Sequence, residues 1–120
     1  MDDTPLLDHA RSPYHYGHCP SVSHRESLRN PMCGDEVCLE LDIEGKTILE
    51  AWFTGRGCVL SQAAASMLCE FIERQSVNEL RQLEVGEFLA LPGFSPTPRR
   101  RQCLLLPFRA LKNLLVQLPQ

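Results

Sequence analysis

Apolar and polar residues alternate over residues 37–43, and this period of two predicts a half-buried β-strand. Glu44-Gly45 then predicts a tight turn into a second strand over residues 46–54, so that the two strands form an antiparallel hairpin. We expect the inner face of the second strand to carry three residues, Leu49, Ala51 and Phe53. Trp52 then lies on the opposite face, where it needs cover from a helix, a partner or a second copy.

Apolar residues at helical spacing predict the other elements, which are helices over residues 3–10, 60–74, 77–83, 84–91 and 106–118. Ser61 and Ser76 are the expected N-caps of the second and third of these helices. Pro107 places the start of the last helix nearby, because proline is tolerated only in a helix's first turn. Residues 11–31 contain many proline, glycine, serine and histidine residues, and we expect a loop there with at most one short strand.

Strands followed by helices predict an α+β fold, with a small antiparallel β-sheet of about three strands and helices packed on one face. A chain of 120 residues has little left for a second core, so we expect a single domain over residues 1–120. The apolar fraction of 43% is normal for a globular chain and argues against wholesale disorder.

Charge and composition exclude several classes of protein. The formal net charge of −3 argues against a protein built mainly to bind nucleic acid. No apolar stretch reaches the roughly 18–20 residues that cross a membrane, and the first residues lack the features of a signal peptide. We therefore expect a cytoplasmic protein. In that reducing compartment, the six cysteines are metal ligands, reactive thiols or buried small residues rather than disulfides.

Three cysteines, Cys33, Cys58 and Cys103, lie at predicted element boundaries, where functional side chains are common. Asp35 follows Cys33 by two residues and adds a carboxylate. Cys58 precedes a predicted helix, whose N-terminus favours a thiolate. Cys103 also precedes a predicted helix and follows the basic run of residues 99–101, which we expect to favour its thiolate form.

If these residues meet, three sulfurs and one carboxylate match a tetrahedral Zn²⁺ or an iron centre. The spacing alone does not show that they meet, and each cysteine could instead be a small buried residue. The other three cysteines, Cys19, Cys38 and Cys69, are expected to be incidental thiols.

Three motifs in order carry a family resemblance: Asn30-Pro31-Met32-Cys33-Gly34-Asp35, then Gly55-Arg56-Gly57-Cys58, then Arg100-Arg101-Gln102-Cys103. Together they resemble the IscU/SufU (NifU N-terminal-like) family, and the similarity covers nearly the whole chain. The resemblance implies a non-enzymatic iron–sulfur cluster assembly scaffold or sulfur acceptor that receives persulfide sulfur from a cysteine desulfurase.

The resemblance also implies the residues and the partners. Its ligands for a [2Fe–2S] cluster or Zn²⁺ are Cys33, Asp35, Cys58 and Cys103, with Cys103 and Cys58 as candidate persulfide acceptors. Recipient apoproteins or carrier proteins take the product. The chain is expected to work as a monomer or transient dimer, without nucleic acid or membrane.

Two departures favour the SUF-associated branch of the family. IscU-type scaffolds carry histidine directly before the last cysteine, whereas this chain has Gln102. The family's Leu-Pro-Pro-Val-Lys chaperone motif is replaced by a different segment, Leu91-Pro92-Gly93-Phe94-Ser95. The alternatives are a zinc-binding sulfur-transfer partner of a desulfurase, a structural zinc or interaction domain, and a metal-free thiol redox sensor.

Overall fold

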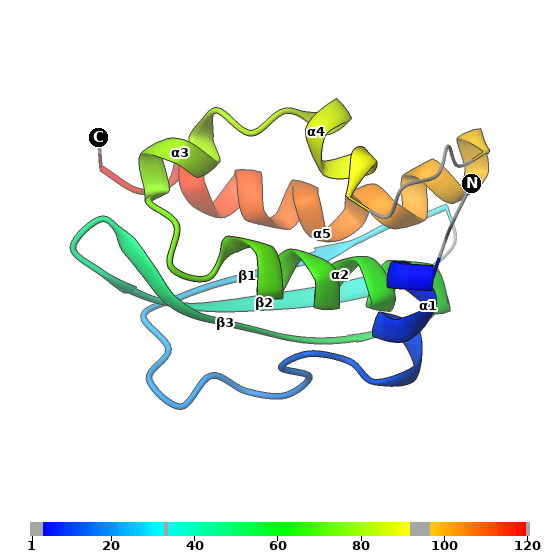
Figure 1. Ribbon diagram of the computed structural model, residues 1–120, viewed down its shortest axis with the longest axis horizontal. Helices are drawn as coiled ribbons and strands as arrows, with labels where there is room; N and C mark the ends of the chain where they lie inside the picture. The colour runs from blue at the N-terminus through cyan, green and yellow to red at the C-terminus, as the bar shows by residue number, and fades with distance from the viewer. Residues whose placement is uncertain (1–3, 33, 92–96, 120) are drawn as a thin grey trace.

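The computed structural model describes residues 4–32, 34–91 and 97–119 (Figure 1). Its elements, in chain order, are α1 (Thr4–Arg11), β1 (His24–Arg29), β2 (Glu36–Glu44), β3 (Thr47–Arg56), α2 (Val59–Ile72), α3 (Val77–Arg81), α4 (Val85–Ala90) and α5 (Pro98–Val116). In this part of the chain, no helix is both long enough and apolar enough to span a membrane.

The three strands form one antiparallel sheet in the order β1-β2-β3. Helices α2 and α5 lie against one face of that sheet and pack on each other, while α3 and α4 lie on the far side of α5 (Figure 1). The core is the apolar layer between the sheet and these helices. This arrangement confirms the predicted α+β fold, with about three strands and helices on one face.

The hairpin of β2 and β3 confirms the two predicted strands but corrects one inward residue. A register shift opposite Asp42 and Ile43 places Ile48 in the core with no exposed surface, while Leu49 is 40% exposed. The expectation that Leu49 faces inward was wrong because a bulge breaks the period of two at this point. Beyond the bulge, Ala51 and Phe53 are buried as predicted.

The last helix begins earlier than the sequence pattern predicted. Thr97 caps α5 by accepting a hydrogen bond from the backbone N–H of Arg100, and Pro98 occupies the first turn. Pro107 therefore lies inside the helix, where its buried side chain packs in the core. Cys103 lies within α5 rather than before it, which corrects both the helix start and the placement of this cysteine.

Two predicted helix caps had different outcomes. Ser76 caps α3 and forms a capping box with Glu79, as predicted. The cap of α2 is not Ser61 but Cys58, whose Sγ accepts a hydrogen bond from the backbone N–H of Leu60. Ser61 is buried and donates its hydroxyl hydrogen to the carbonyl of Cys58.

Residues 12–20, here called the N-terminal strap, cover part of the sheet face opposite the helices (Figure 1). The strap pairs with β3 through two backbone hydrogen bonds, from Phe53 N–H to His15 O and from Gly17 N–H to Phe53 O. The His15 ring stacks on Trp52 with ring centroids 4.1 Å apart. Trp52 therefore lies on the outer face, as predicted, and the strap itself provides the cover that it needs.

Candidate metal centre

Asp35, Cys58 and Cys103 come together at one end of the sheet. One oxygen of the carboxylate and the two sulfurs all lie within 4.8 Å of one another. Asp35 directly precedes β2, Cys58 is the N-cap of α2, and Cys103 lies in the second turn of α5. Three segments far apart in the sequence thus bring three of the four predicted ligands into one cluster.

Cys33, the fourth predicted ligand, lies outside the described residues. Two backbone hydrogen bonds join Asn30 to the residues after position 33, from Asn30 N–H to Asp35 O at 2.8 Å and from Gly34 N–H to Asn30 O at 2.7 Å. Gly34 has a φ of +79°, which favours glycine at that point of the turn. The role of Cys33 as a ligand stays a prediction.

Asp35 has the environment of a carboxylate held ready for a cation. The residue is only 3% exposed, and its Oδ1 accepts a hydrogen bond of 2.7 Å from the backbone N–H of Cys58. Among the described residues, its buried Oδ2 has no hydrogen-bond partner. A buried carboxylate oxygen without a partner is unfavourable. A metal ion bound beside the two sulfurs would satisfy this oxygen.

Cys58 lies where the sequence predicted, at the N-terminus of a helix. Its backbone N–H bonds to Asp35 and its carbonyl accepts the Ser61 hydroxyl hydrogen at 2.9 Å, so the residue is held from both sides. Its sulfur faces the first turn of α2, where the unpaired N–H groups and the helix dipole stabilise negative charge.

Cys103 has a pKa raised to about 12 in the absence of metal. Burial is the main cause, followed by the sulfur of Cys58 and the carboxylate of Asp35. The expectation that the arginine run favours its thiolate was wrong, because Arg100 and Arg101 are exposed to solvent and two acidic groups face the sulfur instead. A cation bound between the three groups would stabilise the thiolate form of Cys103.

Gly57 shapes the wall behind Asp35. Its φ is +112°, and a Cβ built on it would lie 2.2 Å from Asp35 Oδ1 and 2.9 Å from Asp35 Cα. Only glycine leaves room for the carboxylate at this position. The sequence pointed to Gly57 only as part of the Gly55-Arg56-Gly57-Cys58 motif, which gave no sign that this glycine makes room for Asp35.

The donor set fits a metal centre. Two thiolates and one carboxylate suit tetrahedral Zn²⁺ or iron, and the unpartnered Oδ2 is the observation in this structure that supports such an ion. Cys19, Cys38 and Cys69 do not belong to the cluster. Gln102 does not join it either, because its side chain accepts a 2.7 Å hydrogen bond from Arg109 on the exposed side of α5.

The family of the chain follows from comparison with known proteins. Residues 2–116 match the family model of the NifU-like N terminal domain. The chain belongs to this family, which confirms the resemblance seen in the three motifs.

Its relatives carry two kinds of name. The iron–sulfur cluster assembly scaffold protein IscU of Streptococcus pyogenes serotype M1 is 30% identical, covering 90% of this chain and 78% of the relative. IscU of Thermotoga maritima is also 30% identical, covering 96% of this chain and 92% of the relative. The zinc-dependent sulfurtransferase SufU of Bacillus subtilis is 28% identical, covering 90% of this chain and 84% of the relative. The relatives thus include both scaffolds and a sulfurtransferase.

Solved structures agree on the fold. A candidate iron–sulfur cluster assembly scaffold of the SUF system from Fervidobacterium islandicum AW-1 superposes with a TM-score of 0.74 at 24% identity, over 92% of this chain and 93% of that one. The N-terminal part of a NifU-like protein from Brucella abortus gives a TM-score of 0.75 at 19% identity, over 94% of this chain and 90% of that one.

Proposed function

We propose that this chain is a cytoplasmic iron–sulfur cluster assembly scaffold that accepts sulfur from a cysteine desulfurase and binds iron or a nascent cluster as its cargo. Residues 1–120 act as one domain in this proposal, and recipient apoproteins or carrier proteins take the product. The observation that carries the proposal is the buried Oδ2 of Asp35, which has no hydrogen-bond partner among the described residues and belongs to the cluster with the sulfurs of Cys58 and Cys103. The relatives named as scaffolds support it.

The proposed ligands are Cys33, Asp35, Cys58 and Cys103. In this set the carboxylate is the weaker iron ligand, and it keeps a bound cluster labile enough to pass on. Sulfur arrives when a thiol of the chain, Cys103 or Cys58, attacks the terminal sulfur of a persulfide on the donor. The S–S bond of the donor breaks, the donor cysteine leaves as a thiol, and the chain carries the new persulfide.

A second candidate function is that of a zinc-dependent sulfur-transfer partner, and one relative specifically favours it. The Bacillus subtilis protein, which is 28% identical to this chain over the aligned residues, is named a zinc-dependent sulfurtransferase. A set of two or three thiolates and a carboxylate also suits tetrahedral zinc. In that case zinc is a resident ion, and the chain is closer to an enzyme than to a scaffold.

Elemental analysis with an optical spectrum, on protein purified without oxygen, tests both functions. The measurement is made before and after incubation with iron, cysteine and a desulfurase. Iron and sulfide with a visible charge-transfer band, transferable to an apoprotein, are expected for a scaffold. Stoichiometric zinc that does not exchange for iron, together with sulfur acceptance, would instead establish the zinc-dependent sulfur carrier.

Single substitutions test the ligands. We expect Asp35→Ala, Cys58→Ser and Cys103→Ser each to lose the bound metal, and Cys33→Ser to do the same. Cys38→Ser is the matched control, because Cys38 lies on the outer face of β2, away from the cluster. Metal retained by all four single variants would contradict the proposed function.

Chelation distinguishes the scaffold from a structural zinc domain. The apolar core between the sheet and helices α2 and α5 is built without the metal ligands, so we expect the metal-free protein to stay folded. Loss of the circular dichroism signal on removal of the metal would favour a structural zinc site instead.

A further inference from the structure

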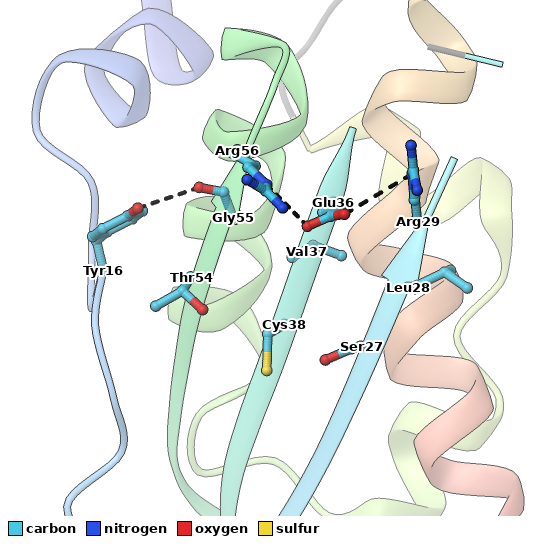
Figure 2. Close-up of a pocket in the computed structure, with 10 residues that line it drawn as sticks. All are labelled: Tyr16, Ser27, Leu28, Arg29, Glu36, Val37, Cys38, Thr54, Gly55 and Arg56. Atoms are coloured by element: carbon cyan, nitrogen blue, oxygen red, sulfur yellow. Dashed lines mark hydrogen bonds and ion pairs between the residues drawn. The ribbon is translucent and has the colours of Figure 1, made fainter. Parts of the chain in front are cut away.

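The outer face of the sheet carries a pocket (Figure 2), which lies at the same end of the sheet as the metal centre. Its volume is about 480 Å³, within the range of sites that bind small ligands or peptide side chains. Glu36 and Arg56 line the pocket, and they are the immediate neighbours of Asp35 and Gly57 in the chain. A segment bound in this pocket would therefore be anchored next to Asp35 and Cys58.

The floor and wall of the pocket suit a peptide better than an apolar ligand. Ser27, Cys38 and Thr54 are cross-strand neighbours on β1, β2 and β3, and they form a floor of small polar side chains. The N-terminal strap contributes Tyr16, whose hydroxyl donates a hydrogen bond to the carbonyl of Gly55 and whose ring is half exposed. A shallow polar floor with one aromatic wall has room for an extended segment.

Two arginines at the mouth give the pocket its charge. Arg29 and Arg56 both pair with Glu36, through Nε–Oε distances of 3.9 Å and 3.1 Å (Figure 2). Their side chains are 68% and 80% exposed. In both pairs the contact uses Nε, so the terminal Nη groups are available to another acceptor. Two guanidinium groups share one carboxylate, and the mouth keeps an excess of positive charge.

From this charge and position we infer that the pocket is a docking site for an extended acidic segment of the protein that delivers sulfur. This inference rests on the proposed function, because it assigns a partner to a pocket that lies at the same end of the sheet as the proposed sulfur-accepting thiols. Carboxylates of the segment pair with the Nη groups of Arg29 and Arg56, and the chain lies over the Ser27, Cys38 and Thr54 floor. The docked donor is then held at the end of the sheet where Arg56 leads into Cys58.

Fluorescence anisotropy with a fluorescein-labelled peptide of alternating glutamate and serine tests the docking site on zinc-loaded protein at low salt. Replacing both arginines, Arg29→Gln with Arg56→Gln, is expected to weaken binding roughly fivefold or more. Glu36→Gln is expected to strengthen binding by about twofold, because it removes the competing carboxylate. If Arg29, Glu36 and Arg56 served only to stabilise the fold, the arginine and glutamate substitutions would not change peptide binding in opposite directions.

Lys46→Gln is the matched control, because Lys46 is an exposed cation in the turn at the other end of the sheet. We expect it to bind the peptide as the wild type does. Unchanged binding by the double arginine variant would overturn the docking site, as would equally tight binding of a single-stranded oligonucleotide.

Sulfur transfer from a cysteine desulfurase to the wild-type chain and to the double arginine variant separates this inference from the proposed function. The double arginine variant should keep its metal and its maximal transfer rate but need a higher desulfurase concentration for half-maximal transfer. If the wild-type chain binds the peptide but accepts no sulfur, that result would contradict both the proposed function and the sulfur donor as the partner. If the double arginine variant needs the same desulfurase concentration for half-maximal transfer as the wild type, that result would contradict the docking site alone.

Discussion

Gly57 shows how one residue without a side chain can position a metal ligand. A Cβ at this position would overlap Asp35 Oδ1 at 2.2 Å, and the backbone there adopts a positive φ of +112°. Asp35 is in turn fixed by the N–H of Cys58, so the glycine, the carboxylate and the thiol form one rigid unit. The geometry of the centre therefore depends on a residue that cannot itself bind metal.

Gly57→Ala should displace Asp35 and reduce metal binding at least as strongly as Asp35→Ala does. The strained backbone should also lower the free energy of unfolding by about 1–3 kcal/mol. Zinc content and denaturant unfolding measure the two effects. Gly86→Ala is the control, because a Cβ at Gly86 in α4 meets no atom within 4 Å. Full metal occupancy in Gly57→Ala would contradict this account of Asp35.

Cys103 should be unreactive in the metal-free protein at neutral pH. Its pKa of about 12 keeps the thiol protonated, and alkylation requires the thiolate. We expect the alkylation rate, followed by mass spectrometry, to rise about tenfold per pH unit up to that pKa. Asp35→Asn should speed the reaction, because it removes one of the charges that raise the pKa.

The raised pKa of Cys103 also predicts how the stability of the metal-free protein changes with pH. The pKa in the fold lies above the value of about 8.5 for an unfolded chain, so the fold binds this proton more tightly. The contribution to stability is complete below about pH 8.5 and is lost as the pH rises toward 12. Alkylation of the native apoprotein at neutral pH as fast as that of the denatured chain would contradict both expectations.

At the scale of single residues, the sequence was informative where the signal was local. Asp35, Cys58 and Cys103 each lie in a short motif, and all three meet in the structure. The raised pKa of Cys103 was not predictable, because it comes from burial and from two residues distant in the sequence. The sequence offered only the neighbouring arginines, which point into solvent.

Among the elements, α5 shows why a correct local rule can misplace a helix. Proline inside a helix removes one backbone hydrogen bond, here the one that the carbonyl of Cys103 would accept from residue 107. The buried ring of Pro107 packs in the core, and this packing offsets part of that loss. Helix boundaries thus depended on tertiary contacts, while the periodic parts of β2, β3 and α2 were predicted from local pattern alone.

Helices α3 and α5 hold each other's ends. Arg81 of α3 donates from Nη2 to the carbonyls of Leu118 and Pro119 after α5, at 3.0 Å and 3.1 Å. Lys112 of α5 donates from Nζ to the carbonyls of Leu80 and Arg81, both at 2.9 Å. Each cation also lies at the negative end of the other helix.

Arg81→Met should therefore lower the free energy of unfolding by about 1–3 kcal/mol, because charged donors are lost from partly buried carbonyls. Denaturant unfolding measures the change. Arg109→Met is the matched control, since Arg109 is exposed on α5 and bonds only the Gln102 side chain among the described residues. Equal effects of the two substitutions would show that the reciprocal caps contribute nothing measurable.

Across the whole molecule, helix α2 connects the metal centre to the N-terminal strap. Cys58 is the N-cap of α2 and Glu73 is its C-cap, so the two sites lie at opposite ends of one helix. Glu73 accepts hydrogen bonds from the Tyr14 hydroxyl and from the backbone N–H of Ala51 at 2.9 Å, and its Oε2 lies 2.9 Å from His15 Nδ1. The bond to Glu73 is the main reason that the pKa of Tyr14 is raised to about 12.

Glu73→Ala should release the strap from the sheet without removing the metal. Trp52, the only tryptophan of the chain, then loses the stacked His15 ring, and its fluorescence emission should shift to longer wavelength. We expect the free energy of unfolding to fall by about 1–3 kcal/mol, because the Tyr14 hydroxyl and the Ala51 N–H lose a partly buried acceptor. Zinc content should not change, since the ligands lie at the other end of α2.

Glu70→Ala is the control for this substitution, because the Glu70 side chain is 61% exposed and contacts only His9 among the described residues. Unchanged Trp52 emission in Glu73→Ala would mean that backbone pairing with β3 is sufficient to hold the strap. Loss of zinc together with the emission shift would mean that α2 transmits the change from one end to the other. In that case the strap and the metal centre would be coupled rather than independent parts of the fold.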